Sequence, residues 1–231
     1  MLEAYDQQGV AMTCRGWDEY ARMFDLRRAD VSGLEVLDVA AGASSFVADA
    51  AAMGAQSVAV DPRYRMEQDR IYTEAKQEIE TSTAKLARLT DRFNWSFYGN
   101  LARHRQMRLA NLKRFDAHRR CAPEHYVDGQ LPELPFPDQA FSLVLCSHFL
   151  FLYGEQLDFQ FHERAIGELM RVCRTGGRVL IYPLVTLHFR QYDRLQALCT
   201  RLQSHRAYVC LKPARLPFIP GSTHYLSIQL E

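Results

Sequence analysis

The apolar residues of this chain recur with two spacings, and each spacing predicts one type of element. Short apolar runs predict buried strands, whereas apolar residues three and four positions apart predict amphipathic helices. The runs predict strands at 35–39, 57–60, 125–127, 141–147, 178–183, 207–211 and 225–230. The helical spacings predict helices at 17–24, 46–53, 157–174 and 186–204, and two more within 63–121. In the last of these regions the two stripes are Ile71, Ala75, Ile79, Leu86 and Leu89, and then Leu101, Leu109, Leu112 and Phe115.

Strands and helices alternate along most of the chain, and this order predicts the fold class. Alternation favours a parallel sheet with helices on both faces. The last two expected strands are joined by a loop rich in proline and glycine, which predicts an antiparallel edge. We therefore expect an α/β fold: a Rossmann-like, doubly wound sheet of about seven mostly parallel strands with an antiparallel C-terminal edge. We expect a single domain over 1–231, with 63–121 as an inserted helical cap.

Local residues indicate where two of the helices begin and end. Ser44 or Ser45 can cap the helix that starts at Phe46, and Gly54 suits its C′ position. The segment 175–177, Thr-Gly-Gly, is expected to end the helix that begins near Leu157.

Charge is balanced over the whole chain but uneven along it. The 231 residues include 28 Lys+Arg and 27 Asp+Glu, and 48% are hydrophobic, which is typical of a globular protein. Residues 63–121 hold 14 basic against 7 acidic residues, so this segment carries net charge +7 and the remainder carries −6. Such a basic segment can bind phosphates, but a charge run is more often a solvated face. Its helical basic residues are Arg103, Arg105, Arg108, Lys113, Arg114, Arg119 and Arg120.

The cysteines and the longest apolar run exclude several classes. None of the six cysteines lies in a C-x-x-C pair or beside a histidine at ligand spacing, which argues against a zinc site or a disulfide framework. We expect reduced thiols in the cytosol. The longest apolar stretch, 143–153, is shorter than the ~20 residues of a membrane span, so neither export nor membrane insertion is expected.

Polar residues follow three of the expected strands at the points where a ligand binds in open α/β sheets. Asp38 precedes a turn of small residues, 40–45, whose backbone amides a ligand can reach at a helix N-terminus. Asp61 follows the second strand, where a carboxylate can accept hydrogen bonds from both hydroxyls of a ribose. The pair Asp128 and Gly129 ends the third strand, where an acid can accept the exocyclic amine of adenine. The three strand ends together predict an adenosine site.

With these residues the chain resembles the class I S-adenosylmethionine-dependent methyltransferases. The resemblance covers residues 17–231 apart from the basic insert, and it extends to the stretches 127–141 and 168–177 and to the closing strand pair. It implies S-adenosylmethionine as cofactor. It also implies that Asp38 and the loop with Ala40, Gly42 and Ser44 hold the methionine end, and that Ser147 lies near the amino group. The further implied contacts are Asp61 to the ribose, Pro62 and Arg63 beside the adenine, and Asp128 and Gly129 at its edge.

The loop departs from the Gly-x-Gly-x-Gly pattern of that family. Only Gly42 remains, while Ala40 and Ser44 each add a small group that is either tolerated or narrows the pocket. A Gly-x-Gly-x-x-Gly dinucleotide loop would need glycine at 40, 42 and 45, so a nicotinamide dehydrogenase is disfavoured. Each acid also has a plain structural interpretation, as a helix cap or a solvated turn residue.

Candidate catalytic residues follow the fourth strand. His148 has the pKa range of a general base for an acceptor that must lose a proton, and Tyr153 is a second candidate. The alternative is that His148 hydrogen-bonds backbone while Phe149, Phe151 and Tyr153 cover the cofactor. Weaker candidates are Tyr20, Tyr64 and His188. The sequence after this strand, Cys146 to Phe149, lacks the Asn/Asp-Pro-Pro-Tyr/Phe element of nucleic-acid amino-methyltransferases.

Three functions remain open from the sequence. The first is methyl transfer by in-line displacement to a small-molecule acceptor, with the insert shaping the acceptor site. The insert's aromatic residues Phe93, Trp95, Phe97 and Tyr98 are candidates to line it. The second is a non-catalytic binding or regulatory protein with the same fold. The third is RNA methylation through the basic insert. The sequence does not define the acceptor or the oligomeric state.

Overall fold

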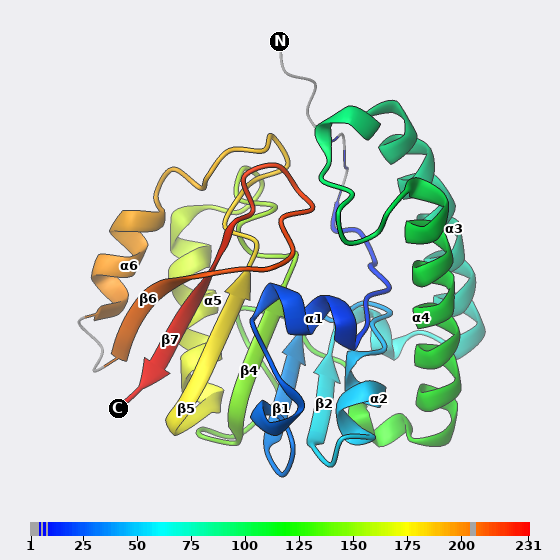
Figure 1. Cartoon of the computed structure of the whole chain (residues 1–231). Helices are drawn as coiled ribbons and strands as arrows, with labels where there is room; N and C mark the ends of the chain where they lie inside the picture. The colour runs from blue at the N-terminus through cyan, green and yellow to red at the C-terminus, as the bar shows by residue number, and fades with distance from the viewer. Residues whose placement is uncertain (1–4, 6, 8, 204–206) are drawn as a thin grey trace.

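A seven-stranded sheet forms the centre of the part of the chain that the computed structural model describes, residues 5, 7, 9–203 and 207–231. The strand order is β3-β2-β1-β4-β5-β7-β6, and every pair is parallel except those that involve β7 (Figure 1). The mostly parallel sheet with an antiparallel C-terminal edge is therefore confirmed. The strands are β1 (Glu35–Val39), β2 (Gln56–Val60), β3 (Tyr126–Val127), β4 (Phe141–Ser147), β5 (Cys173–Tyr182), β6 (Ala207–Pro213) and β7 (His224–Leu230).

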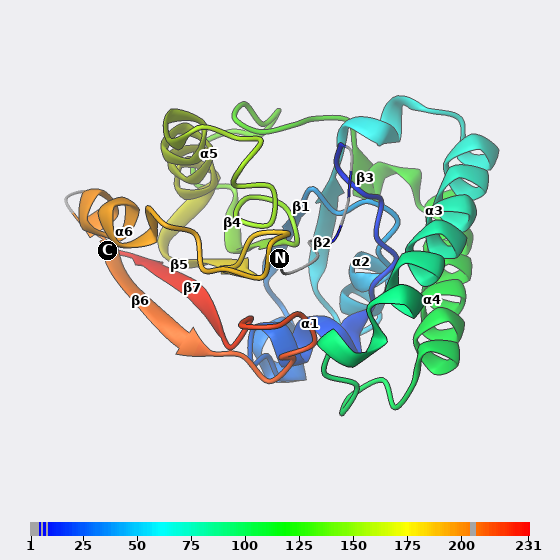
Figure 2. The ribbon, with the colours of Figure 1, turned by 90° about the horizontal axis from the view of Figure 1, so that it is seen from above.

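Helices cover both faces of the sheet, as Figure 2 shows from above. The helices α5 and α6 lie on one face, α1 and α2 lie on the other, and α3 and α4 stand side by side beyond the β3 edge. This is the doubly wound arrangement expected from the alternation. The helices are α1 (Trp17–Met23), α2 (Phe46–Ala51), α3 (Gln68–Arg88), α4 (Leu101–Cys121), α5 (Phe159–Val172) and α6 (Leu195–Gln203). No helix in the described part of the chain is long and apolar enough to cross a membrane.

Successive residues of the inner strands pack into two separate hydrophobic cores, one on each face of the sheet. Val36 and Leu143 pack on the side of α1 and α2, whereas Leu37 and Val144 pack on the side of α5 and α6. All four are fully buried. Because side chains alternate along a strand, a strand covered on both faces needs apolar residues at consecutive positions, which explains its continuous apolar run.

The structure corrects the expected end of the helix that precedes β5. α5 ends at Val172, and 173–177 is the irregular start of β5 rather than a turn between helix and strand. Phe141 pairs with Cys173, and the register shifts before Leu143. The glycines serve this irregularity: Gly176 has φ +75°, and a Cβ on Gly177 would lie 2.9 Å from the carbonyl oxygen of Ser142.

A second correction concerns the helix expected over 186–204. Only α6 is helical there, and Ser204 lies outside the described residues. In the preceding segment Val185 pairs with Gln191, and the Thr186 hydroxyl accepts a hydrogen bond from the amide of His188. A threonine side chain that satisfies a nearby amide competes with the helical pattern, so this segment forms a loop.

The insert between β2 and β3 is helical, as its two apolar stripes predict. Ile71, Ala75, Ile79 and Leu86 of α3 are buried, as are Leu112 and Phe115 of α4, while the other members of the stripes are half-buried. The side chain of Asn100 caps α4 by accepting a hydrogen bond from the amide of Arg103. The long crossover thus builds a helix pair beside the carboxyl ends of β1 and β2.

Candidate functional site

The polar residues predicted from the strand ends lie at one edge of the sheet. β1 is parallel to β2 and β4, and β2 is parallel to β3, so all four strands end at the same edge. Asp38 lies in β1, Asp61 directly follows β2, Asp128 follows β3 and Ser147 ends β4. The structure therefore brings the predicted acids to a common edge.

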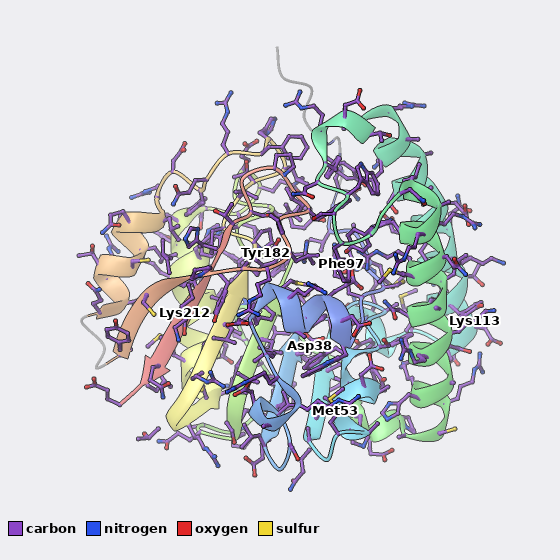
Figure 3. All side chains as sticks on the ribbon, viewed as in Figure 1. Asp38, Met53, Phe97, Lys113, Tyr182 and Lys212 are labelled. Carbon is purple, nitrogen blue, oxygen red and sulfur yellow. The ribbon has the colours of Figure 1, made fainter. Side chains whose placement is uncertain are left out.

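The Asp38 carboxylate is enclosed beneath α1, in the region labelled in Figure 3. The Tyr20 hydroxyl lies 2.9 Å and 3.1 Å from its two oxygens and donates to them, and the Ser147 hydroxyl donates to Tyr20 at 3.1 Å. Tyr20 is held by stacking on Phe46, with ring centroids 4.4 Å apart. Because Asp38 is fully buried, its pKa is raised to about 8, with the nearby Asp61 adding to the effect.

The buried acid Asp38 leads to a prediction about stability and pH. The folded-state pKa lies above the unfolded value, so the stabilisation linked to its proton is complete below about pH 4 and is lost as the pH rises toward 8. Asp38→Asn removes this titration. In urea unfolding, the free energy of unfolding of the variant minus that of the parent should rise by more than about 1.4 kcal/mol between pH 4.5 and pH 8, which is the equivalent of one pKa unit. A difference that stays constant with pH would contradict the assignment.

Asp61 binds two backbone amides. Its oxygens accept hydrogen bonds from Gly42 at 3.0 Å and from Arg63 at 2.9 Å, which joins the loop after β1 to the end of β2. Tyr64 strengthens the same junction by donating to the Gly42 carbonyl at 2.8 Å. Burial raises the pKa of Asp61. The carboxylate is therefore fixed in position before any ligand arrives.

The loop after β1 is covered by residues 11–16, an extended segment that precedes α1. Ala43 donates its amide to the Thr13 carbonyl at 3.1 Å, and Ser45 donates to the Arg15 carbonyl at 2.8 Å. A Cβ on Gly42, where φ is +59°, would lie 3.1 Å from the Thr13 nitrogen. Two of the loop amides that were predicted to face a ligand thus donate hydrogen bonds to residues 13 and 15 of the chain itself. Residues 5–16 have no apolar periodicity, so no sequence signal pointed to this cover.

A cavity of about 100 Å³ lies beside the segment 11–16. It contains both predicted catalytic residues, His148 and Tyr153, but neither Asp38 nor Asp61. Its walls come from the N-terminal segment, the inserted helices, the loop after β4 and two C-terminal loops. They comprise Tyr5, Gln7, Ala11, Met12, Thr13, Cys14, Arg15, Glu78, Ile79, Ser82, Leu86, Phe93, His104, Arg108, His148, Leu152, Tyr153, Leu187, Phe189, Phe218 and Ile219.

Several buried polar atoms of this cavity have no hydrogen-bond partner. They are Nε and Nη1 of Arg15, Nδ1 of His104, Nδ1 of His148 and Oε1 of Glu78. Burial and the charges of Arg108 and Arg15 lower the pKa of His104 to about 2, and the same three influences lower the pKa of His148. Both imidazoles are therefore neutral at physiological pH. Buried polar groups are normally paired, so these atoms mark a place for a polar ligand.

The two catalytic candidates are held by backbone contacts. His148 has φ +54°, and its amide donates to the Tyr182 carbonyl at 2.6 Å, which orients the ring toward the cavity. The Tyr153 hydroxyl accepts the amide of Ala11 at 2.8 Å, and burial raises its pKa. One part of the alternative interpretation is wrong: Phe151 packs on the α5 side against His162, not over the strand ends.

The weaker candidates lie elsewhere. His188 pairs with Glu155 in an exposed contact at 2.6 Å, and the hydroxyls of Tyr20 and Tyr64 bind Asp38 and Gly42. Of the residues implied for the adenine, Pro62, Asp128 and Gly129 border a separate surface groove, which is lined by Pro62, Arg65 and 128–135. The Arg63 side chain instead donates to the carbonyl of Val10. Gly129 has no room for a side chain, because a Cβ would lie 2.7 Å from Pro135.

Five of the 14 basic residues of the insert form ion pairs with acids in the part of the chain that the structure describes. Arg105 pairs with Glu80 at 2.6 Å and Arg114 pairs with Asp49 at 3.1 Å, while Arg120 contacts Asp69 and Asp116. Lys113 lies on the outer side of α4, away from the sheet (Figure 3). Of the aromatic residues expected at an acceptor site, Phe93 lines the cavity, whereas Trp95, Phe97 and Tyr98 pack around it.

Comparisons with known proteins relate part of the chain to methyltransferases. Residues 81–181 match the family model described as Methyltransferase domain, a stretch from α3 to β5 that excludes Asp38 and Asp61. An uncharacterized protein of Methanocaldococcus jannaschii, MJ0045, is 29% identical over 174 residues, 75% of this chain and 77% of that one. The chain is also similar to the 1,6-didemethyltoxoflavin-N1-methyltransferase of Burkholderia thailandensis, with TM-score 0.50, 13% identity, and 93% and 81% of the two chains covered.

Residues 81–181 therefore match a methyltransferase domain, and the described part of the chain has the fold of the class I S-adenosylmethionine-dependent methyltransferases, as the resemblance found in the sequence implies. Proteins of this class use S-adenosylmethionine as methyl donor. The residues present fit that group chemically: carboxylates at the ends of β2 and β3 suit the ribose hydroxyls and the adenine amine. The unpartnered buried atoms line the separate cavity beside residues 11–16.

Proposed function

We propose that this enzyme transfers the methyl group of S-adenosylmethionine to a small-molecule acceptor by in-line displacement, and that the acceptor binds in the cavity beside residues 11–16. The observation that carries the proposal is the position of this cavity. It lies between the inserted helices and the loop after β4, and it holds unpartnered buried polar atoms. Within a single domain over 1–231, the insert 63–121 would act as the cap of the acceptor site.

We assign the donor to the edge formed by β1, β2, β3 and β4. Asp38, Ala40, Gly42, Ser44 and Ser147 would surround its methionine end. Asp61 would hold the ribose, with Pro62 and Arg63 beside the adenine and Asp128 and Gly129 at its edge. The fixed Asp61 carboxylate supports this assignment, because each oxygen accepts one amide and retains a lone pair for a hydroxyl.

The donor supplies a methyl group that is already activated on a sulfonium, so the chain's main task is alignment. Proximity and orientation can supply about 7 to 11 kcal/mol of the barrier. The apolar walls exclude water, and the neutral His148 lines the cavity with an unpartnered Nδ1 that can accept a hydrogen bond from an oxygen or nitrogen acceptor. Its lowered pKa makes it a weaker general base than the sequence predicted. Tyr153 keeps its phenolic proton at physiological pH and can orient the acceptor.

Two further features bear on the partner and the compartment. The ion pairs of Arg105, Arg114 and Arg120 with nearby acids favour a small-molecule acceptor over RNA, since paired guanidinium groups are less available to phosphates. The six cysteines are free thiols, which supports a cytosolic enzyme.

The donor half of the proposal is tested by titration calorimetry with S-adenosylhomocysteine and S-adenosylmethionine. We expect both to bind with dissociation constants of about 1–100 μM, which corresponds to roughly −8 to −5.5 kcal/mol. NAD⁺ at the same concentrations serves as the control and should give no heat of binding. If neither sulfur nucleoside binds at millimolar concentration, the enzyme proposal fails in favour of a non-catalytic role.

A further inference from the structure

Arg15 is a buried arginine whose side chain enters the cavity without a hydrogen-bond partner. Its carbonyl accepts from Ser45 and from the Ser44 hydroxyl, which fixes the backbone against the loop after β1. The residue is 9% exposed, and neither Nε nor Nη1 has a partner. Arg15 therefore reaches from the donor loop into the proposed acceptor site.

The nearest acid does not satisfy Arg15, because other groups already occupy it. Glu19 lies 3.9 Å from Arg15 Nε, too far for a hydrogen bond. The same carboxylate accepts from Arg108 at 2.5 Å, from the Tyr98 hydroxyl at 2.6 Å and from Asn111 at 3.1 Å. Glu19 and Arg108 thus neutralise each other, and the guanidinium of Arg15 remains as an unsatisfied donor.

Glu78 is the acid that lines the cavity, and the structure shows no direct ion pair between it and Arg15 in the described residues. His104 and His148 are neutral, and their lowered pKa values reflect burial together with the positive field of the two arginines. An isolated buried charge is costly and is normally paired with an opposite one.

The remaining walls of the cavity are mostly apolar. Met12, Leu86, Phe93, Leu152 and Phe218 present apolar and aromatic surface to the same space. A guanidinium group matches a carboxylate with two parallel hydrogen bonds, which makes it selective for planar oxyanions. The cavity thus combines an apolar wall with one unsatisfied carboxylate-binding group.

We propose that the methyl acceptor is a small apolar or aromatic carboxylic acid, and that Arg15 binds its carboxylate. This inference rests on the proposed function, because it takes the cavity to be the acceptor site. Arg15 then determines specificity by discriminating a carboxylate from its neutral analogue.

The test compares two matched pairs of probes, benzoate with benzamide and phenylacetate with phenylacetamide, titrated into protein saturated with S-adenosylhomocysteine. In the parent protein at least one acid should bind tenfold or more tightly than its amide. Arg15→Gln should reduce that ratio to nearly one. Arg15→Lys keeps the charge without the planar fork and should retain part of the preference. Arg103→Gln, an equal charge change on the exposed side of α4, should leave the ratio unchanged.

The controls separate this inference from other outcomes. Equal affinity of acid and amide in the parent protein, or a ratio that Arg15→Gln does not alter, would overturn it while S-adenosylhomocysteine still binds. The competing source of a carboxylate is the donor's own amino-acid end. In that case Arg15→Gln would weaken S-adenosylhomocysteine tenfold or more but spare 5′-methylthioadenosine, which lacks that end, and the acceptor assignment would fall.

A purely structural role for Arg15 gives a different stability result. Removing a buried donor that has no partner should leave the thermal midpoint of the ligand-free protein unchanged or raise it. A structural role predicts that the thermal midpoint falls by several degrees in both Arg15→Gln and Arg15→Lys, while both variants keep the preference for the acid. That result would show that Arg15 stabilises the fold rather than recognises a ligand.

Discussion

Asp61→Ala should weaken binding of S-adenosylhomocysteine by about 30- to 1000-fold, equivalent to roughly 2–4 kcal/mol, because it removes the charged acceptor proposed for the ribose hydroxyls. The carboxylate is buried and anchored by the amides of Gly42 and Arg63, so little reorganisation is needed when the nucleoside binds. Calorimetric titration of the variant and the parent protein measures the change directly.

The same anchoring requires a control for structural damage, since alanine also leaves two buried amides without an acceptor. The 2′-deoxyribose analogue of S-adenosylhomocysteine supplies this control through a double-mutant cycle. If Asp61 binds the ribose, loss of the 2′-hydroxyl should matter in the parent protein and hardly at all in Asp61→Asn. Equal losses for both ligands would show that the loop, rather than the ribose contact, was disturbed. Asp91→Asn, at an exposed position outside the proposed donor site, is a control for the change of charge alone.

The strands and the mostly parallel sheet with its antiparallel edge were predictable because their signals are local. A strand buried on both faces requires a continuous apolar run, and 141–147 was predicted with its observed bounds. Boundaries failed where a tertiary contact overrides local preference. The glycines at 176 and 177 indicated a turn, but the close approach of the Ser142 carbonyl makes the same residues suitable for an irregular strand start.

The candidate site was predictable only in part, for a similar reason. Acids at the ends of parallel strands meet because of sheet geometry, so Asp38, Asp61 and Asp128 could be placed together from the sequence. The role of Arg15 depends on residues about 90 positions away, in α4, and on an extended segment with no periodic pattern. Contacts of that range leave no trace in the spacing of apolar residues.

The departures of the loop from the glycine pattern have a structural explanation in this segment. Ser44 donates its hydroxyl to the Arg15 carbonyl at 2.9 Å and accepts a hydrogen bond from the amide of Phe46 at 3.1 Å, so it binds both the covering segment and the first amide of α2. Glycine could make neither bond. Ala40 adopts φ +55°, at a cost of about 1 kcal/mol relative to glycine. The loop therefore keeps its turn while holding the residue that we assign to acceptor recognition.

Glu19→Gln should produce the largest loss of stability, about 3–5 kcal/mol in urea unfolding, because it leaves Arg108 buried without a counter-ion. Glu19 is fully buried and joins α1 to α4 through its bonds to Arg108 and Asn111, while its bond to Tyr98 reaches the segment before α4. The m value should stay constant, since the surface exposed on unfolding does not change. High salt should affect the loss little, because a buried pair is screened weakly.

Two control variants test whether the buried pair of Glu19 and Arg108 causes this loss. One alters an ion pair between the two inserted helices, and the other is a double variant. Glu80→Gln removes an acid from the half-exposed pair with Arg105 and should cost no more than about 1 kcal/mol. Adding Arg108→Met to Glu19→Gln removes the uncompensated charge, so the double variant should be more stable than Glu19→Gln alone. A loss below 1 kcal/mol in Glu19→Gln would mean that Glu19 does not neutralise Arg108. The charge balance from which Arg15 emerges as the unsatisfied cation would then have to be abandoned.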